Sequence, residues 1–142
     1  MCLDRLKTKE EKKEILKDMP KKSIVVYKVV NKCEGKYFPP CRYCDSYVEG
    51  LNKVPIFRRY ISTCCPNYKG IFLDYKVGFH SFKYKNDAQK YSNHITLNTS
   101  TVIECQINQS WITEIGEQNL GAITYFGICF VTNKIIFPKY EE

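Results

Sequence analysis

The sequence predicts a single α+β domain, in which an antiparallel or mixed sheet is flanked by an N-terminal helix and one short second helix. Runs of β-branched and aromatic residues, separated by Asn, Gly and Gln turns, fill most of the chain after residue 23. Helix signals occur in two places, and the 142 residues, of which 44% are hydrophobic, are enough for one core. We therefore expect one domain over 1–142, with a helical segment at 1–22 and a sheet-rich core at 23–138.

The first predicted element is a helix over residues 8–19. Thr8 and Glu11 have capping-box spacing, good helix formers follow, and Pro20 cannot continue the helix. Its narrow apolar face consists of Ile15, Leu16 and Met19. Basic and acidic residues are interleaved over 1–22, which favours a solvated helix face over an arm that meets an anionic partner.

The strands are predicted from β-branched runs and from the turn residues between them. Residues 23–31 are expected to form a central strand, and Pro39-Pro40 is expected to begin a long ordered loop that reaches Val54. Further strands are expected at 56–62, 70–77, 101–107, 111–116, 122–131 and 134–137.

The stretch from Gly78 to Lys83 is predicted to be a turn, and it carries His80, one of two histidines. A short helix is expected to follow from Asn86, where Gln89 gives capping spacing, through about Ser92. Because turn chemistry, charge and aromatic residues meet here, we expect a functional site close to this stretch.

The chain has eight cysteines, and Met1-Cys2-Leu3-Asp4-Arg5 does not open a secretory signal. We therefore expect reduced thiols and a cytoplasmic protein, with no membrane partner, since no run approaches the ~20 apolar residues of a membrane helix. Cys41 and Cys44 have the C-x-x-C spacing of a zinc site, which Cys33 or Cys64-Cys65 could complete. No second such motif follows, so we favour scattered thiols over structural zinc and expect no cofactor.

Residues suited to nucleophilic or acid–base catalysis are few. His80 and His94 are the two histidines, and a lone histidine is more often a hydrogen-bonded polar group than a base. Glu104 and Glu117 alternate with apolar strand residues and are expected first of all to face solvent. No glycine-rich phosphate-binding motif is present. The sequence therefore favours a binding protein over an enzyme.

Basic residues interleaved with aromatic residues form the best candidate site. The expected ligand-binding residues are Tyr27, Lys28, Arg58, His80, Phe82 and Lys83. Arg58 and Lys83 would hold a phosphate by charge, and the ring of Tyr27 or Phe82 would stack on a base. We expect a small anionic, nucleotide-like ligand and no long nucleic acid, because the basic groups are spread through the chain and the pI is about 8.9.

Four short motifs follow one another in an order that resembles a known group of proteins. The motifs are Val25-Val26-Tyr27-Lys28-Val29-Val30, Gly35-Lys36-Tyr37, Gly78-Phe79-His80-Ser81-Phe82 and Val102-Ile103-Glu104-Cys105. Over residues 24–137 the chain resembles small, mostly uncharacterised phage and low-GC bacterial proteins that begin with a Tyr-Lys-Val strand and carry a Gly-Phe-His turn. Some small phage proteins sequester nucleotide signals of bacterial immunity. The resemblance thus implies an anti-defence role in the host cytoplasm.

A more remote similarity is to the ADP-ribosyltransferase fold. There, a first strand carries His or Arg for NAD, a Gly-aromatic turn precedes a short helix, and a late strand offers a catalytic Glu. Tyr27 and Lys28 stand at the first position, Gly78 to Ser81 at the second, and Glu104 or Glu117 at the third. Because the first position departs from the pattern, the resemblance implies a degenerate site that still binds a nucleotide.

Three functional hypotheses follow from these residues. The first is a non-enzymatic protein that sequesters an anionic nucleotide-like ligand. The second is an ADP-ribosyltransferase-like or nucleotide-cleaving enzyme that uses His80 with Glu104 or Glu117. The third is an inhibitor that binds a host protein directly through a tyrosine-rich sheet face. Sheet edges and the 11 tyrosines also favour a homo-oligomer.

Overall fold

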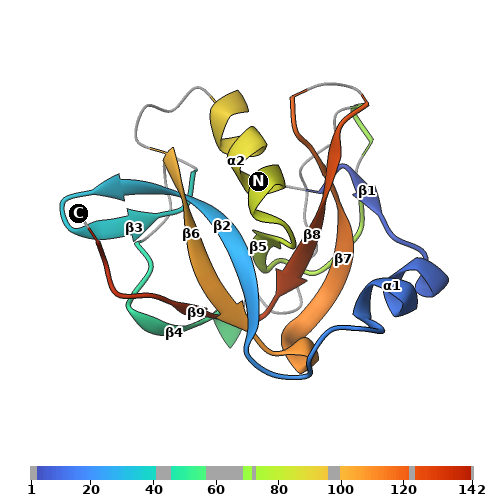
Figure 1. The fold of residues 1–142 in the computed structure, drawn as a ribbon, viewed down its shortest axis with the longest axis horizontal. Helices are drawn as coiled ribbons and strands as arrows, with labels where there is room; N and C mark the ends of the chain where they lie inside the picture. Colours follow the sequence, from blue (N-terminus) through green and yellow to red (C-terminus); the bar gives the residue numbers. More distant parts are fainter. Residues whose placement is uncertain are drawn as a thin grey trace.

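The computed structural model describes residues 3–40, 46–56, 69–71, 73–95, 100–121 and 124–141. Over these residues the chain forms one nine-stranded antiparallel sheet and two α-helices, which confirms the predicted α+β fold (Figure 1). The strands are β1 (Arg5–Leu6), β2 (Ile24–Cys33), β3 (Lys36–Phe38), β4 (Gly50–Lys53), β5 (Phe79–Phe82), β6 (Ser100–Ile107), β7 (Ile112–Asn119), β8 (Phe126–Thr132) and β9 (Lys134–Phe137). The helices are α1 (Lys9–Leu16), α2 (Lys85–His94) and the short 3-10 helix η2 (Gln109–Trp111).

The strands are ordered β1-β7-β8-β5-β2-β6-β9-β4, with β3 pairing β2 as a hairpin. β2 pairs β6 along most of its length, from Ile24 opposite Ile107 to Asn31 opposite Ser100. β2 is therefore the central strand that its β-branched run predicts. The hairpin to β3 turns at Gly35, whose φ of 74° lies in the left-handed region that glycine adopts readily.

Two hydrophobic clusters cover the opposite faces of this sheet. The first contains Ile115 of β7, near one end of the strand order, together with Ile135 and Phe137 of β9, near the other end. Strands from both ends share one cluster because the sheet curls around it (Figure 1). The second cluster lies beneath α2 and includes Phe82 and Ala88. We call these the inner and the outer cluster.

The helix α1 begins as the sequence predicts. The Thr8 hydroxyl accepts a hydrogen bond from the Glu11 backbone N–H at 3.2 Å, and the Glu11 carboxylate accepts one from the Thr8 N–H at 3.0 Å. This capping box satisfies two N–H groups that the helix leaves unpaired. Leu16 is the last helical residue, and together with Ile15 and Met19 it packs against the inner cluster, so the predicted apolar face is confirmed.

Several strand predictions are wrong, and each error has a physical reason. The alternation over 70–77 gives no strand in its described residues apart from an isolated bridge at Lys76. Tyr75 is instead buried against the outer cluster. The predicted loop at 39–54 contains β4, because β9 offers Gly50–Lys53 a free edge that the sequence does not reveal. The strand expected at 56–62 lies outside the described residues from 57 onward.

The stretch predicted to turn at Gly78 is instead a central strand. Phe79 to Phe82 form β5, which pairs β8 on one side and β2 on the other. A strand fits because Phe79 packs with the inner cluster and Phe82 with the outer one, so successive side chains alternate between faces. The second helix, α2, starts at Lys85 after Tyr84, and Asn86 does not cap it.

Candidate functional site

The two adjacent site candidates on β2 lie on opposite faces of the sheet, because side chains alternate along a strand. Lys28 follows the same alternation as Val26 and Val30, which belong to the inner cluster. Tyr27 packs against the outer cluster. Lys28 is only 5% exposed, and its ammonium group donates a hydrogen bond to the His80 carbonyl oxygen at 2.7 Å. The structure therefore separates this cation from the rings of Tyr27 and Phe82.

Phe82 is completely buried in the outer cluster, where its ring centroid lies 5.6 Å from that of Tyr91. It lies directly opposite Tyr27 in the pairing of β5 with β2. Phe82 thus belongs to the packed core beneath α2, and its ring face contacts protein side chains.

His80 is held in a chain of hydrogen bonds on the same side. The Leu3 backbone N–H donates to the Tyr75 hydroxyl oxygen at 2.8 Å, and that hydroxyl lies 3.0 Å from His80 Nε2. Burial, and after it nearby positive charges including that of Lys28, lowers the pKa of His80 to about 3. The imidazole is therefore neutral near pH 7, and its Nε2 shares a hydrogen bond with the Tyr75 hydroxyl. This arrangement fastens the start of the chain to the sheet.

The remaining predicted site residues lie elsewhere. The Lys83 ammonium group lies 5.1 Å from the centroid of the Tyr84 ring, where the chain leaves β5 for α2. Arg58 and the proposed zinc ligands Cys41 and Cys44 lie outside the described residues. Over the described part of the chain, no three His, Cys, Asp or Glu residues are grouped so that they could hold a metal ion.

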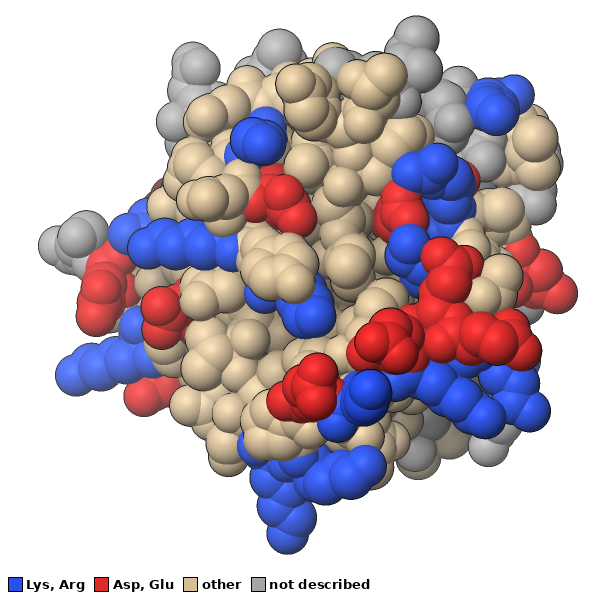
Figure 2. Space-filling view, turned by 45° about the vertical axis from the view of Figure 1, so that its right-hand side comes forward, with Lys and Arg blue, Asp and Glu red and all other residues tan. Residues whose placement is uncertain are grey.

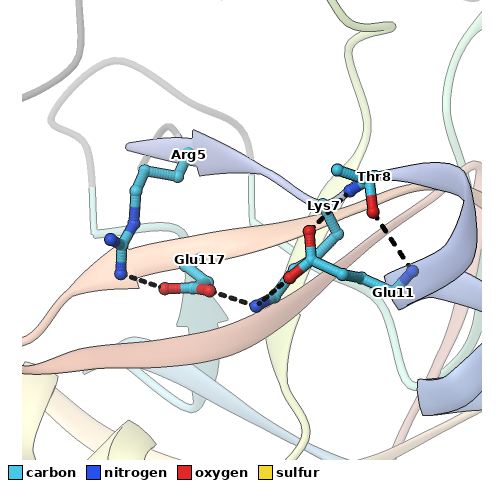
Figure 3. Close-up of polar contacts among 5 residues, drawn as sticks. All are labelled: Arg5, Lys7, Thr8, Glu11 and Glu117. Atoms are coloured by element: carbon cyan, nitrogen blue, oxygen red, sulfur yellow. Dashed lines mark hydrogen bonds and ion pairs between the residues drawn. The ribbon is translucent and has the colours of Figure 1, made fainter.

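The acidic residues proposed for catalysis are also apart from one another. Glu104 is exposed on β6, opposite Tyr27. The Glu117 carboxylate on β7 forms ion pairs with Arg5 and Lys7 (Figure 3). His94 ends α2. Glu117 therefore has a structural partner in the β1 segment.

Of the cysteines in the described residues, Cys105 and Cys129 are buried and free, and Cys33 is exposed and free. Burial raises the pKa of Cys105 to about 12 and that of Cys129 well above its ordinary value. Both buried thiols are protonated near neutral pH and act as small apolar side chains in the core. None of the helices in the described residues is both long and apolar enough to cross a membrane.

A cleft in the described part of the chain lies between α1 and the η2–β7 segment. Its volume is about 500 Å³. Apolar side chains of Leu16, Ile112 and Ile115 line part of it. The other lining residues are polar or charged, namely Lys12, Lys21, Lys22, Asn108, Gln109, Ser110, Thr113 and Glu114. The cleft thus combines an apolar surface with three lysines.

The three lysines differ in the partners that they have. Lys12 forms an ion pair with Glu114 across the cleft. The Lys21 ammonium group donates a hydrogen bond to the Gln109 side-chain oxygen at 2.9 Å. Lys22 is exposed, and none of the described residues gives it a hydrogen bond or an ion pair. Lys21 and Lys22 therefore carry positive charge that the described protein does not neutralise.

The rim that carries these lysines is fixed by hydrogen bonds from η2. The Gln109 backbone N–H donates to the Lys21 carbonyl at 2.8 Å, and the Asn108 side-chain oxygen accepts from the Ser23 N–H at 3.1 Å. The Gln109 amide also donates to the Pro20 carbonyl at 3.4 Å. A rim held in this way loses little conformational entropy when a ligand binds.

Ion pairs fasten the other wall of the cleft to the sheet. Glu117 lies between Arg5 and Lys7, and Lys7 also contacts Glu11 of α1 (Figure 3). The hydrogen bond that the Lys7 ammonium group donates to the Glu117 carboxylate is the main reason why the pKa of Lys7 is raised. These contacts hold the β1 segment and the start of α1 against β7.

Charges on the α1 side of the molecule are mixed. Figure 2 shows acidic and basic side chains next to one another over much of this face, with basic side chains gathered at its lower edge. Figure 1 places the connection from α1 to β2, which carries Lys21 and Lys22, at that lower edge. A long polyanion needs an extended basic stripe, whereas this arrangement offers a local one.

The fold and the cleft define an α+β protein with an open antiparallel sheet and a small cationic cleft. Comparison of the chain with known protein families, with curated proteins and with solved structures found no match.

Sequence reasoning missed this cleft, although it weighed the basic segment at 1–22 as an arm for an anionic partner. Lys21-Lys22 after Pro20 was the available signal. Its partner, the Asn108-Gln109-Ser110 turn, lies more than eighty residues away along the chain, as the contact of Lys21 with Gln109 shows. Such a pairing cannot be read from local patterns.

Proposed function

We propose that the protein binds a small anionic, nucleotide-like ligand in the cleft between α1 and η2, and that it acts by sequestering this ligand without chemical change. The observation that carries the proposal is the cleft of about 500 Å³ with Lys12, Lys21 and Lys22 on its walls. Small-molecule sites in proteins commonly have volumes of about 300–1,000 Å³. The proposed ligand class is the one that the sequence predicts, but the proposed contacts are those of this cleft in place of Tyr27, Lys28, Arg58, His80, Phe82 and Lys83.

The lining suits a ligand with one anionic end and one ring. Lys21 and Lys22 supply charge-assisted hydrogen bonds to phosphate oxygens. Leu16 and Ile112 supply an apolar surface on which a flat base can be buried. The side chains of Asn108, Gln109 and Ser110 can donate hydrogen bonds to the edge of a base and accept hydrogen bonds from it.

Sequestration fits this lining better than catalysis does. The lining residues in the described chain offer ammonium, amide and hydroxyl groups, but no imidazole or thiol. The Glu114 carboxylate is engaged by Lys12. Binding and release of an intact ligand need only affinity and stoichiometry. The resemblance to phage proteins supports a host immune nucleotide as the ligand.

The test is to incubate purified protein with a mixture of cyclic nucleotides and ADP-ribose derivatives, remove unbound compounds, and analyse the complex by native mass spectrometry. We expect about one equivalent of one compound per subunit, released unchanged on heating. The double variant Lys21→Ala, Lys22→Ala should retain about tenfold less, because charge-assisted contacts are lost.

Lys36→Ala is the matched control, because Lys36 is an exposed lysine on β3, far from α1 in Figure 1. It should bind as the wild type does. No retention at micromolar concentration, or equal retention by the double variant and the wild type, would refute the proposal. Conversion of more than one equivalent of ligand would replace it with the enzyme hypothesis, and loss of that conversion in His80→Ala would then locate the activity.

A further inference from the structure

A buried lysine at the centre of the sheet lies outside the proposed cleft. Lys28 on β2 is 5% exposed, although lysine is rarely buried without an acidic partner. Its ammonium group donates one hydrogen bond, to the His80 carbonyl at 2.7 Å, and lies 5.3 Å from the centroid of the Tyr47 ring. Among the described residues no carboxylate forms an ion pair with it. An ammonium has three donors, so two have no partner among the residues that the structure describes.

Two further polar groups are buried on the same face. Ser81 of β5 and Thr132 of β8 are both 0% exposed, and among the described residues neither hydroxyl oxygen has a hydrogen-bond partner. A buried hydroxyl without a partner costs about 1–3 kcal/mol, so such groups are rare in folded proteins. Because the Ser81 and Thr132 hydroxyls lie on the same face as the buried Lys28 ammonium, one bound group could account for all three.

The strand register brings these three residues together. Tyr27 lies opposite Phe82, so the next residue on β2, Lys28, lies next to Ser81 on β5. Phe79 lies opposite Thr132 and is two residues from Ser81, which places Thr132 diagonally across from Ser81 on the same face. All three side chains alternate with residues of the outer cluster and therefore belong to the inner face.

We propose that Lys28, Ser81 and Thr132 form a second binding site, for a small monovalent anion such as chloride or a carboxylate group. The three residues supply unused donors around one uncompensated positive charge, which is the arrangement that an anion requires. Water could satisfy the two hydroxyls but would leave the charge without a counter-ion. Val26, Val30 and Phe130 in the same cluster are fully buried, so the occupant is small and the site does not compete for the nucleotide-like ligand of the cleft.

The experiment is thermal unfolding of the full chain in sodium chloride, sodium formate and sodium sulfate at one constant ionic strength. We expect the melting temperature of the wild type to rise with chloride or formate and to saturate, because a ligand that binds only the folded state stabilises it by mass action. Sulfate should not reproduce the saturating rise, since its size and double charge do not suit the site. Lys28→Met should abolish the saturating rise.

Lys32→Met is the matched control on the same strand. Its ammonium group also donates to a backbone carbonyl, that of Glu141 at 2.6 Å, and lies 5.7 Å from a tyrosine ring centroid, but it is near the surface. It should keep the saturating response. The double variant Lys21→Ala, Lys22→Ala should keep it too, so failure of this site and failure of the cleft are distinguishable.

If Lys28→Met does not fold, the double variant Ser81→Ala, Thr132→Val gives a second test. It removes two unpaired buried hydroxyls, so it should fold, and its apparent affinity for chloride or formate should fall about tenfold. Equal melting temperatures of the wild type in all three salts at that ionic strength, or a saturating response that survives in Lys28→Met or in the hydroxyl variant, would overturn the proposal.

Discussion

The buried imidazole of His80 makes the stability of this protein depend on acidity in a defined way. In the folded state its pKa is lowered to about 3 from an ordinary value of 6.5, chiefly by burial. At pH values between about 3 and 6.5, His80 is therefore protonated in the unfolded chain and neutral in the folded chain. Stability from this group is fully present above pH 6.5 and is lost progressively as the pH falls toward 3.

The gap between the two pKa values sets the magnitude. At about 1.4 kcal/mol per pH unit, the interval from 6.5 to about 3 corresponds to roughly 5 kcal/mol, which is an upper limit because unfolded chains retain some structure. A domain of this size is stable by only about 5–15 kcal/mol. The perturbation to make is His80→Gln, since glutamine keeps a hydrogen-bond acceptor for Tyr75 but does not titrate in this range.

The assay is urea unfolding at a series of pH values between neutral and acidic, followed by circular dichroism. The unfolding free energy of the wild type should fall steeply through the acidic range, and that of His80→Gln should fall by several kcal/mol less. His94→Gln is the control, because His94 is an exposed histidine at the end of α2. Parallel profiles for the wild type and His80→Gln would refute the reasoning, as would an equal flattening in His94→Gln.

Three further predictions concern the scaffold of the site. Phe82→Ala should lower the unfolding free energy by about 3–5 kcal/mol in urea titration, because the ring is fully buried, and should leave ligand binding by the folded fraction unchanged. Gly116→Ala should lower it by about 1–3 kcal/mol, since a Cβ would lie 2.3 Å from the Arg5 carbonyl oxygen, and should raise hydrogen exchange in β1. Glu117→Gln should lower it by about 1 kcal/mol through the lost ion pairs. In the last case the wild-type advantage should vanish in high salt. The part of it that comes from Lys7 should be lost as the pH rises through the raised pKa of Lys7, above 10.5, whereas the pair with Arg5 should persist. An unchanged stability in any of these variants would contradict the corresponding contact.

Local patterns predicted those parts of the fold that depend on neighbouring residues. The capping box of Thr8 with Glu11, the β-branched run of β2 and the alternation of Cys105 and Ile107 along β6 are all found in the structure. In each case the local preference agrees with the tertiary environment, which is the condition under which pattern reasoning succeeds.

Prediction from the sequence failed where the structure of a segment depends on which strands pair with it. Residues 79–82 follow Gly78, and a glycine at this point favours a turn. They form a strand because β2 and β8 both pair with their backbone, one on each side. The described residues of the alternating run near Tyr75 form only an isolated bridge at Lys76, and Tyr75 packs with the outer cluster. β1 has two residues, so it has no period to read, and it is defined by its register with Glu117 and Gly116.

The candidate site could be predicted less well than the fold. The sequence identified cationic and aromatic residues, but their faces depend on the register of β2 with β5, which put Lys28 inside and Tyr27 on the other side. The cleft depends on hydrogen bonds that join residues 20–23 to residues 108–109. Composition suggests the proposed class of ligand, whereas the proposed location of its site requires these long-range contacts.

The most direct measurement of the central proposal is isothermal titration of the nucleotide retained from the mixture into the wild type, Lys21→Glu with Lys22→Glu, and Lys36→Glu. We predict one site per subunit, a dissociation constant raised about a hundredfold by charge reversal at the cleft, and an unchanged constant for the reversal on β3. Equal affinities for the wild type and the cleft variant, or an equal loss in Lys36→Glu, would contradict the assignment of the ligand to the cleft between α1 and η2.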